Sequence, residues 1–144
     1  MVIHESAEDY LESILVLQQR CGVVHSIDIV NELGFSKPSV SIAMKKLREN
    51  GYISMDASGC ITLNESGLAI ANRVYTRHKT ITKLFMLLGV SEETAAEDAC
   101  KVEHDLSDET FRKILDFIAD NETKPYAAAE DSAAASLFPV TGGD

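Results

Sequence analysis

The feature that most constrains this chain is a sharp break between two short helical patterns. Gly34 and Phe35 end the first pattern, and Ser36-Lys37-Pro38 opens the second, with a proline in the first turn, where helices tolerate one. The first pattern predicts a helix over Ser26–Leu33 with Ser26 as its N-cap, and the second predicts a helix that continues to about Asn50. Two short helices joined by so tight a turn form a helix-turn-helix unit.

The segments on either side of this break extend the unit. A first helix is expected from about His4 to Gln19, ahead of the two short ones. Downstream, strand-like segments at Tyr52–Met55 and Cys60–Leu63 flank a turn at Asp56–Gly59, which predicts a small hairpin. The order helix–helix–turn–helix–hairpin is that of a winged helix-turn-helix, whose third helix fits the major groove of DNA.

The rest of the chain predicts three more helices. A long one follows Asn64 or Ser66 and continues through Leu88, a second extends from Ser91 to about His104, and the last starts near Ser107. The last helix carries an apolar stripe that exceeds what so short a chain needs for its own core, which predicts a homodimer through the last two helices. The stripe consists of Phe111, Ile114, Leu115 and Ile118.

The predicted fold is therefore mainly α, with an N-terminal winged helix-turn-helix followed by an α-helical dimerisation domain. Residues 1–72 are assigned to the DNA-binding domain and residues 73–122 to the helical domain, and residues 123–144 are expected to form a weakly ordered tail.

The charge distribution leaves room for a DNA-binding surface despite a net charge of −10. Residues 1–63 carry −3, residues 64–90 carry +3 and residues 91–144 carry −10, so the negative charge lies mainly in the last third. No apolar run approaches the roughly 18 residues of a membrane span, and the spacing of the three cysteines is no disulfide ladder. A cytoplasmic protein with reduced thiols and no membrane partner is expected.

The third helix and the hairpin carry the side chains that we expect to meet double-stranded operator DNA. Short hydroxyls and cations suit phosphates and base edges, and an exposed aliphatic group can touch a thymine methyl. Ile42 is the candidate for that methyl contact, and the alternative is its partial burial against the second helix. A protein-interaction domain of the same topology is the alternative to DNA binding. The predicted DNA-binding residues are Ser36, Lys37, Ser39, Ser41, Ile42, Lys46 and Ser58.

A second group of residues has the chemistry of metal ligands. Cys100, Glu103 and His104 stand at i, i+3 and i+4, so one helix face carries a thiolate, a carboxylate and an imidazole. Asp9 and Glu12 stand at i and i+3 on the first helix. Taken singly, each has an ordinary structural interpretation, such as a solvated helix position or a small buried cysteine. The candidate metal ligands are Asp9, Glu12, His78, Cys100, Glu103 and His104.

Four segments, in this order, resemble the diphtheria-toxin-repressor and manganese-transport-regulator family of metal-dependent transcriptional repressors. They are Glu8–Glu12, Ile27–Leu47, Arg73–His78 and Cys100–Ser107. The resemblance covers about residues 5–120. It implies a homodimer with an N-terminal DNA-binding domain, a helical dimerisation domain and a regulatory metal, as in the short, two-domain branch of the family.

The resemblance also implies how the ligands divide. A principal site would use Asp9 of the first helix together with Cys100, Glu103 and His104. A second ion would use Glu12, His78 and Glu103. Manganese-type members carry a carboxylate in place of Cys100, and iron-type members carry a methionine in place of Asp9, so this chain is a hybrid. A thiolate favours Fe²⁺, Co²⁺ or Zn²⁺, whereas carboxylates and imidazole suit Mn²⁺ and Fe²⁺. The expected cofactor is Mn(II) or Fe(II), with Zn(II), Co(II) or Ni(II) as further ions in vitro.

The predicted function is that of a metal-dependent repressor of manganese or iron homeostasis, and two other functions are its alternatives. A winged-helix redox-sensing repressor would act through the thiol of Cys60 or Cys100, but a sensor thiol needs a lowered pKa and Cys60 has no cation within three residues. A metal-dependent hydrolase would need a positioned base, and no nucleophile motif, phosphate loop or H-E-x-x-H is present. We therefore expect that this protein is not an enzyme.

Overall fold

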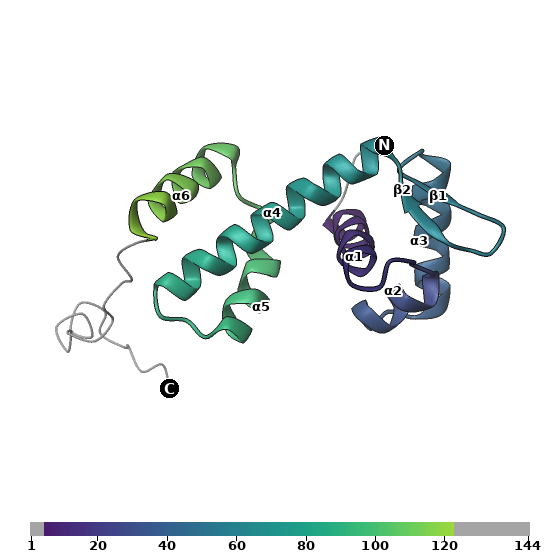
Figure 1. The fold of residues 1–144 in the computed structure, drawn as a ribbon, viewed down its shortest axis with the longest axis horizontal. Helices are drawn as coiled ribbons and strands as arrows, with labels where there is room; N and C mark the ends of the chain where they lie inside the picture. Colours follow the sequence, from purple (N-terminus) through teal and green to yellow (C-terminus); the bar gives the residue numbers. More distant parts are fainter. Residues whose placement is uncertain (1–4, 123–144) are drawn as a thin grey trace, which may run out of the picture. The chain divides into compact units, whose positions relative to one another are not determined.

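The computed structural model describes residues 5–122, and the chain divides into two compact units, Met1–His78 and Lys79–Asp144. The described part is mostly helical, as predicted (Figure 1). The division falls inside a continuous helix, and the predicted tail of residues 123–144 lies outside the described residues. The elements are α1 (Glu5–Cys21), α2 (Ser26–Leu33), α3 (Lys37–Glu49), β1 (Ile53–Met55), β2 (Ile61–Leu63), α4 (Glu65–Leu87), α5 (Glu92–Val102) and α6 (Asp108–Asn121).

In the first unit, α1, α2 and α3 pack around one hydrophobic core. Leu11 and Ile14 of α1 and Ile29 of α2 have no exposed surface. The predicted inner stripe of α3 (Val40, Met44 and Leu47) is buried in the same core. The 3.6-residue period of the sequence therefore located the core faces of the helices.

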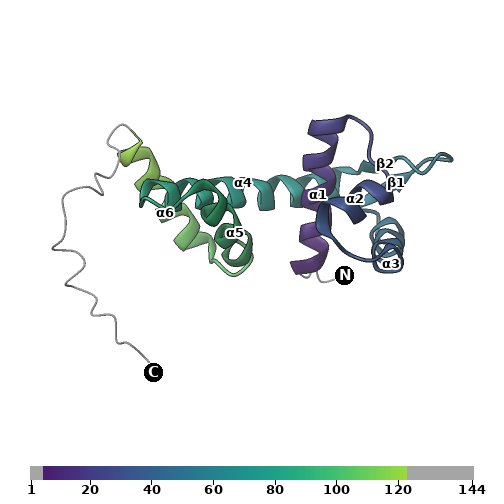
Figure 2. The same ribbon diagram turned by 90° about the horizontal axis from the view of Figure 1, so that it is seen from below.

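The hairpin predicted after α3 is present as a two-stranded antiparallel wing (Figures 1 and 2). Ile53 pairs with Leu63 and Met55 pairs with Ile61, and both isoleucines turn inward to the core. The Ile61 N–H also donates to the Val24 carbonyl at 2.7 Å, which ties the wing to the segment before α2. The wing is thus fixed to the helix-turn-helix by its backbone as well as by its apolar side chains.

The caps of the short helices agree with the predicted break, with one correction. Ser36 caps α3 as expected, since its hydroxyl accepts the Ser39 N–H at 3.2 Å. The prediction of Ser26 as the N-cap of α2 is wrong, because His25 holds that position. The His25 N–H donates to a carboxylate oxygen of Asp28 at 2.8 Å, the backward half of a capping box.

The long helix α4 begins directly after Asn64, the first of the two predicted starts. Gly67 lies in its first turn, where a Cβ atom would stand 2.1 Å from the carbonyl oxygen of Tyr52. Only a glycine permits this close approach. Gly67 therefore allows the first turn of α4 to pack directly against the backbone of Tyr52, just before β1.

The second unit contains the last part of α4 with α5 and α6 beside it (Figures 1 and 2). Ser91 caps α5 and Ser107 caps α6, each by accepting a backbone N–H three residues on. The α5 helix ends at Val102 rather than near His104, so Glu103 is its C-cap. Among residues 5–122, none of the helices has the length and apolar character needed to cross a lipid bilayer.

Candidate metal centre and nucleic-acid interface

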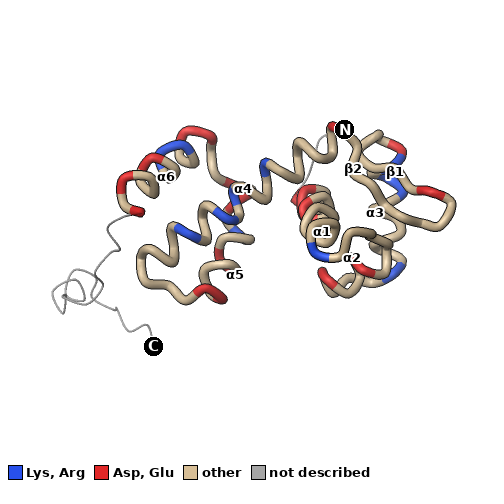
Figure 3. Tube along the Cα trace, in the orientation of Figure 1, with Lys and Arg blue, Asp and Glu red and all other residues tan. Residues whose placement is uncertain are grey.

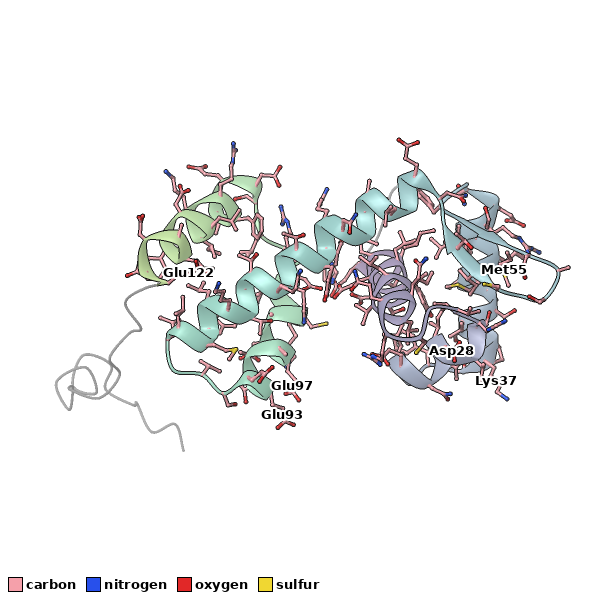
Figure 4. All side chains as sticks on the ribbon, in the orientation of Figure 1. Asp28, Lys37, Met55, Glu93, Glu97 and Glu122 are labelled. Atoms are coloured by element: carbon pink, nitrogen blue, oxygen red, sulfur yellow. The ribbon has the colours of Figure 1, made fainter. Side chains whose placement is uncertain are left out.

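The exposed start of α3 presents hydroxyls and cations. The Ser36 hydroxyl donates to the Ser39 hydroxyl at 2.8 Å, so the two side chains form one polar pair at the helix N-terminus. Lys37 is exposed beside them, and its side chain points away from the domain (Figure 4). Ser41, Ile42 and Lys46 are exposed further along the helix, as the sequence predicted for a DNA-facing surface.

The surface formed by α3 and its N-cap is positively charged over most of its length. Residues 36–48 contain four basic side chains and no acidic one, and lysine and arginine lie along α3 in Figure 3. The first carboxylate after them belongs to Glu49, whose Oε1 lies 4.0 Å from the Lys45 Nζ. A helix N-terminus with neighbouring cations and no carboxylate is suited to phosphate groups.

The wing tip is held by a carboxylate that the sequence analysis did not single out. Oδ1 of Asp56 accepts the hydroxyl of Ser58 at 2.7 Å and the N–H groups of Ser58 and Cys60, each at 2.9 Å. These hydrogen bonds, led by the Ser58 hydroxyl, hold the pKa of Asp56 below its usual range. Because the Ser58 hydroxyl donates to Asp56, it must rotate before it can donate to a phosphate.

In the first unit the candidate metal ligands Asp9 and Glu12 are half-buried on α1. A carboxylate oxygen of Asp9 lies within 4.8 Å of one from Glu12, as the i, i+3 spacing predicts. His78, also half-buried, is the last residue of this unit and lies on α4. The helical turn of α1 alone therefore places the carboxylates of Asp9 and Glu12 side by side.

In the second unit the end of α5 gathers the other three candidates. Glu103 is only 1% exposed, and the imidazole of His104 is 4% exposed. Oε1 of Glu103 lies 3.4 Å from Nε2 of His104, and the Cys100 sulfur lies within 4.8 Å of a Glu103 oxygen. Cys100 itself is exposed. An ionisable carboxylate and an imidazole buried side by side need compensating charge or hydrogen bonds, and a bound cation supplies such charge.

The chemistry of the six candidates fits a divalent transition metal. Carboxylates, imidazoles and a thiolate are the protein ligands of manganese, iron and zinc. The six side chains supply three carboxylates, two imidazoles and one thiol. The residues present are therefore able to hold such an ion.

Comparison with known proteins decides the family. Residues 3–59 match the N-terminal DNA binding domain of the iron dependent repressors, and residues 64–130 match their metal binding and dimerisation domain. The chain is 37% identical over 117 residues to an uncharacterised HTH-type transcriptional regulator of Methanocaldococcus jannaschii, which covers 79% of this chain and 93% of that protein. The chain belongs to the diphtheria-toxin-repressor and manganese-transport-regulator family.

Further relatives agree with the family assignment. The transcriptional regulator MntR of Salmonella typhimurium is 33% identical over 119 residues, covering 83% of this chain and 76% of that protein. The solved structure of the manganese regulator SloR superposes with a TM-score of 0.68 at 27% identity. That match covers 83% of this chain but 55% of SloR, so this chain spans about half of that structure. The chain is thus a metal-dependent transcriptional regulator by family, and family members are regulators rather than enzymes.

The structure adds residues of α1 to the surface of α3. A pocket of about 290 Å³ lies between the two helices, and we name it the α1–α3 pocket. Tyr10 forms part of its wall, and the ring of Phe35 meets the Tyr10 ring edge-on with 5.8 Å between centroids. Sequence reasoning missed this pocket because it assigned α1 only to the core and the metal site. The lining residues are Ser6, Ala7, Tyr10, Ser39, Ile42, Ala43, Lys46 and Leu47.

Proposed function

We propose that this chain is a metal-dependent repressor that binds operator DNA as a homodimer and controls manganese or iron homeostasis. The observation that carries the proposal is the burial of Glu103 and His104 side by side, 3.4 Å apart, next to Cys100. These residues lie in the segment that matches the family's metal binding and dimerisation domain. The winged helix-turn-helix with its basic α3 provides the surface for DNA.

The proposed ligands come from both units of the chain. Asp9, Glu12 and His78 belong to the first unit, and the trio at the end of α5 belongs to the second. A bound divalent ion supplies positive charge that several anionic donors can share. If the ligands of both units hold one ion cluster, their binding energy favours a single orientation of the DNA-binding unit, because a ligand shifts an equilibrium only by its differential affinity for the two states.

The donor set supports Mn(II) or Fe(II) as the physiological metal, with Zn(II), Co(II) and Ni(II) as ions that bind in vitro. Carboxylates are hard ligands that suit Mn²⁺, whereas the thiolate of Cys100 is soft. Affinity alone follows the Irving–Williams order, so the tightest-binding ion need not be the regulatory one. The relative SloR is described as a manganese regulator, and a related structure, ScaR, contains Zn²⁺.

The proposed DNA contacts divide by chemistry. The cations Lys37 and Lys46 and the capping hydroxyl of Ser36 meet phosphates, and Ser58 reaches the backbone from the wing tip. Ser39, Ser41 and Ile42 meet base edges in the major groove. All seven side chains belong to the first unit and, Ser58 aside, lie on α3 or at its N-cap.

The test measures DNA binding with and without metal in a ligand variant and a matched control. Anisotropy is recorded on a labelled duplex from the region upstream of the protein's own gene, with Mn²⁺, Zn²⁺ or anaerobic Fe²⁺. His104→Ala should lower metal affinity by at least the roughly 10–100-fold seen when only an outer-shell partner is lost, and should abolish metal-stimulated binding. Glu97→Gln removes an exposed carboxylate of α5 (Figure 4) and should leave both the metal affinity and the metal-stimulated DNA binding unchanged.

Two results would contradict the proposal. One is a full metal response in His104→Ala, which would remove this residue from the ligand set. The other is DNA binding that ignores every metal but is abolished by peroxide, which would indicate a thiol sensor instead. Circular dichroism of each variant without metal checks that the fold has survived.

A further inference from the structure

The base-reading part of α3 has few side chains that distinguish bases by paired hydrogen bonds. In helix-turn-helix proteins the N-terminal residues of the recognition helix contact base edges. Arginine or lysine reads guanine, and asparagine or glutamine reads adenine, each through two hydrogen bonds. Of these residue types, residues 37–44 contain only Lys37, which is the first residue of α3 and which we assign to a phosphate. Their exposed hydroxyls, Ser39 and Ser41, can bond to either kind of base edge, so they discriminate weakly.

Ile42 is the outstanding side chain on this surface. It is 57% exposed, the largest exposed fraction among the large hydrophobic side chains of residues 5–122. At this exposure Ile42 is not part of the buried core of the first unit. An isoleucine this exposed contributes little to the core, so its apolar surface is available to a binding partner.

The surroundings of Ile42 indicate what that partner is. Ile42 lines the α1–α3 pocket together with Ala43 and Tyr10, which offer further apolar surface. Ser39 and Lys46 line the same pocket, and the helix around it carries four cations and no carboxylate over residues 36–48. The partner must therefore be strongly anionic yet present a small apolar group. Duplex DNA meets both conditions through its phosphates and the C5-methyl group of thymine.

We infer that Ile42, at the edge of the α1–α3 pocket, is the principal base-reading residue and selects a thymine through its methyl group in each operator half-site. This inference rests on the proposed DNA-binding function and adds the base that is read and the means of reading it. The operator preference of this protein then depends on methyl contacts more than on paired hydrogen bonds.

The experiment compares thymine with deoxyuridine, which differs only by the methyl group. Operator duplexes are first selected from a random library in the presence of Mn²⁺ or Zn²⁺. The half-site thymines are then replaced one at a time by deoxyuridine, and affinities are measured for the unaltered protein, Ile42→Ala and Lys37→Ala. At one thymine per half-site, the unaltered protein should lose about fourfold in affinity, the factor for burying one methyl group.

The two variants separate reading from general affinity. Ile42→Ala should bind operator more weakly but should no longer distinguish thymine from deoxyuridine at that position, which a double-mutant cycle measures directly. Lys37→Ala should weaken binding to operator and random DNA alike and retain the fourfold preference. Since Ile42 and Lys37 are both exposed, both variants should fold normally.

The outcomes distinguish the inference from the function on which it rests. The inference would be overturned if deoxyuridine at every position gave the same affinity as thymine, or if the thymine preference survived in Ile42→Ala. Either result would leave DNA binding itself intact. Equal losses on operator and random DNA for Ile42→Ala would overturn it as well. The proposed function itself would be overturned if the unaltered protein selected no duplex from the library in the presence of either metal.

Discussion

The two units of this chain bury their apolar residues to very different extents. Among residues 5–122, 18 hydrophobic side chains are buried, of which 14 belong to the first unit and 4 to the second. Two of those four are the small residues Ala95 and Ala99. Both units leave large apolar side chains exposed: the first has five, and the second has Met86, Leu88, Leu115 and Phe117. The difference lies in the buried residues: the first unit closes a core of its own, whereas the second buries few apolar side chains within the chain and has apolar surface available for a partner.

This contrast fits the division of labour in the family. A DNA-reading unit must hold its recognition helix rigidly, and a closed core provides that rigidity. The second unit matches a metal binding and dimerisation domain, and a homodimer interface has the apolar character of a domain core cut in half. The predicted apolar stripe of α6 divides in the same way: Ile118 is buried within the chain, while Leu115 remains 40% exposed.

The largest effect should come from breaking the closed core of the first unit. Leu11 of α1 has no exposed surface, and Leu11→Ala should lower the free energy of unfolding by about 2–5 kcal/mol, through lost burial and the cavity that remains. Hydrogen exchange in denaturant should show this loss in α1–α3 at every protein concentration. As the control, Leu68→Ala truncates a leucine that is 39% exposed on α4 and should change stability by less than about 0.5 kcal/mol. A similar loss in both variants would mean that the first unit has no closed core.

An intermediate effect should come from the apolar surface of the second unit. Phe117 on α6 is 46% exposed, and Phe117→Ala should weaken the dimer about 30-fold or more if it is an interface hot spot. Sedimentation equilibrium at micromolar concentration, with and without metal, measures the dissociation constant. Lys113→Ala changes an exposed residue of the same helix and should leave it unchanged. An unaltered protein that sediments as a monomer under both conditions would contradict the homodimer.

The sequence predicted those parts of the molecule whose signals are local. Helix stops and starts such as Ser36-Lys37-Pro38, and the 3.6-residue period of Val40, Met44 and Leu47, correctly located the helices and their inner faces. The capping of α2 by His25 was missed because histidine is an uncommon N-cap, and the signal lay instead in Asp28 three residues on.

The same reasoning explains the candidate site. The proximity of Cys100 and Glu103 could be predicted because the i, i+3 spacing extends to the C-cap of α5, where Glu103 keeps helical backbone angles, and His104 follows directly after it. The α1–α3 pocket could not, because Ser6 and Ser39 become neighbours only when two helices distant in sequence pack together. The hydrogen bonds within Asp56–Cys60 were local enough to predict, since aspartate two residues before serine forms such turns.

The smallest effect should appear at the wing, where the first unit extends beyond its core. The pKa of Asp56 is lowered in the folded chain, chiefly by the Ser58 hydroxyl and then by the Cys60 N–H. A lowered folded pKa means that the charged carboxylate stabilises the turn above the ordinary aspartate pKa of about 3.9 and that this contribution is lost as pH falls through the folded value. Because Asp56 is exposed, the effect should be confined to the turn and leave global unfolding almost unchanged.

Two variants check the cause of this pH dependence by NMR titration and amide exchange. Ser58→Ala removes the leading hydrogen bond, so the pKa of Asp56 should rise toward its ordinary value. Asp56→Asn keeps an acceptor oxygen but no charge, so protection of the Cys60 amide should fall and lose its dependence on pH below about 5, because hydrogen bonds to a neutral acceptor are weaker. An Asp56 that titrates at its ordinary value in the unaltered protein would show that the turn is not held by its carboxylate, and the wing would then depend on the Ile53 and Ile61 contacts with the core alone.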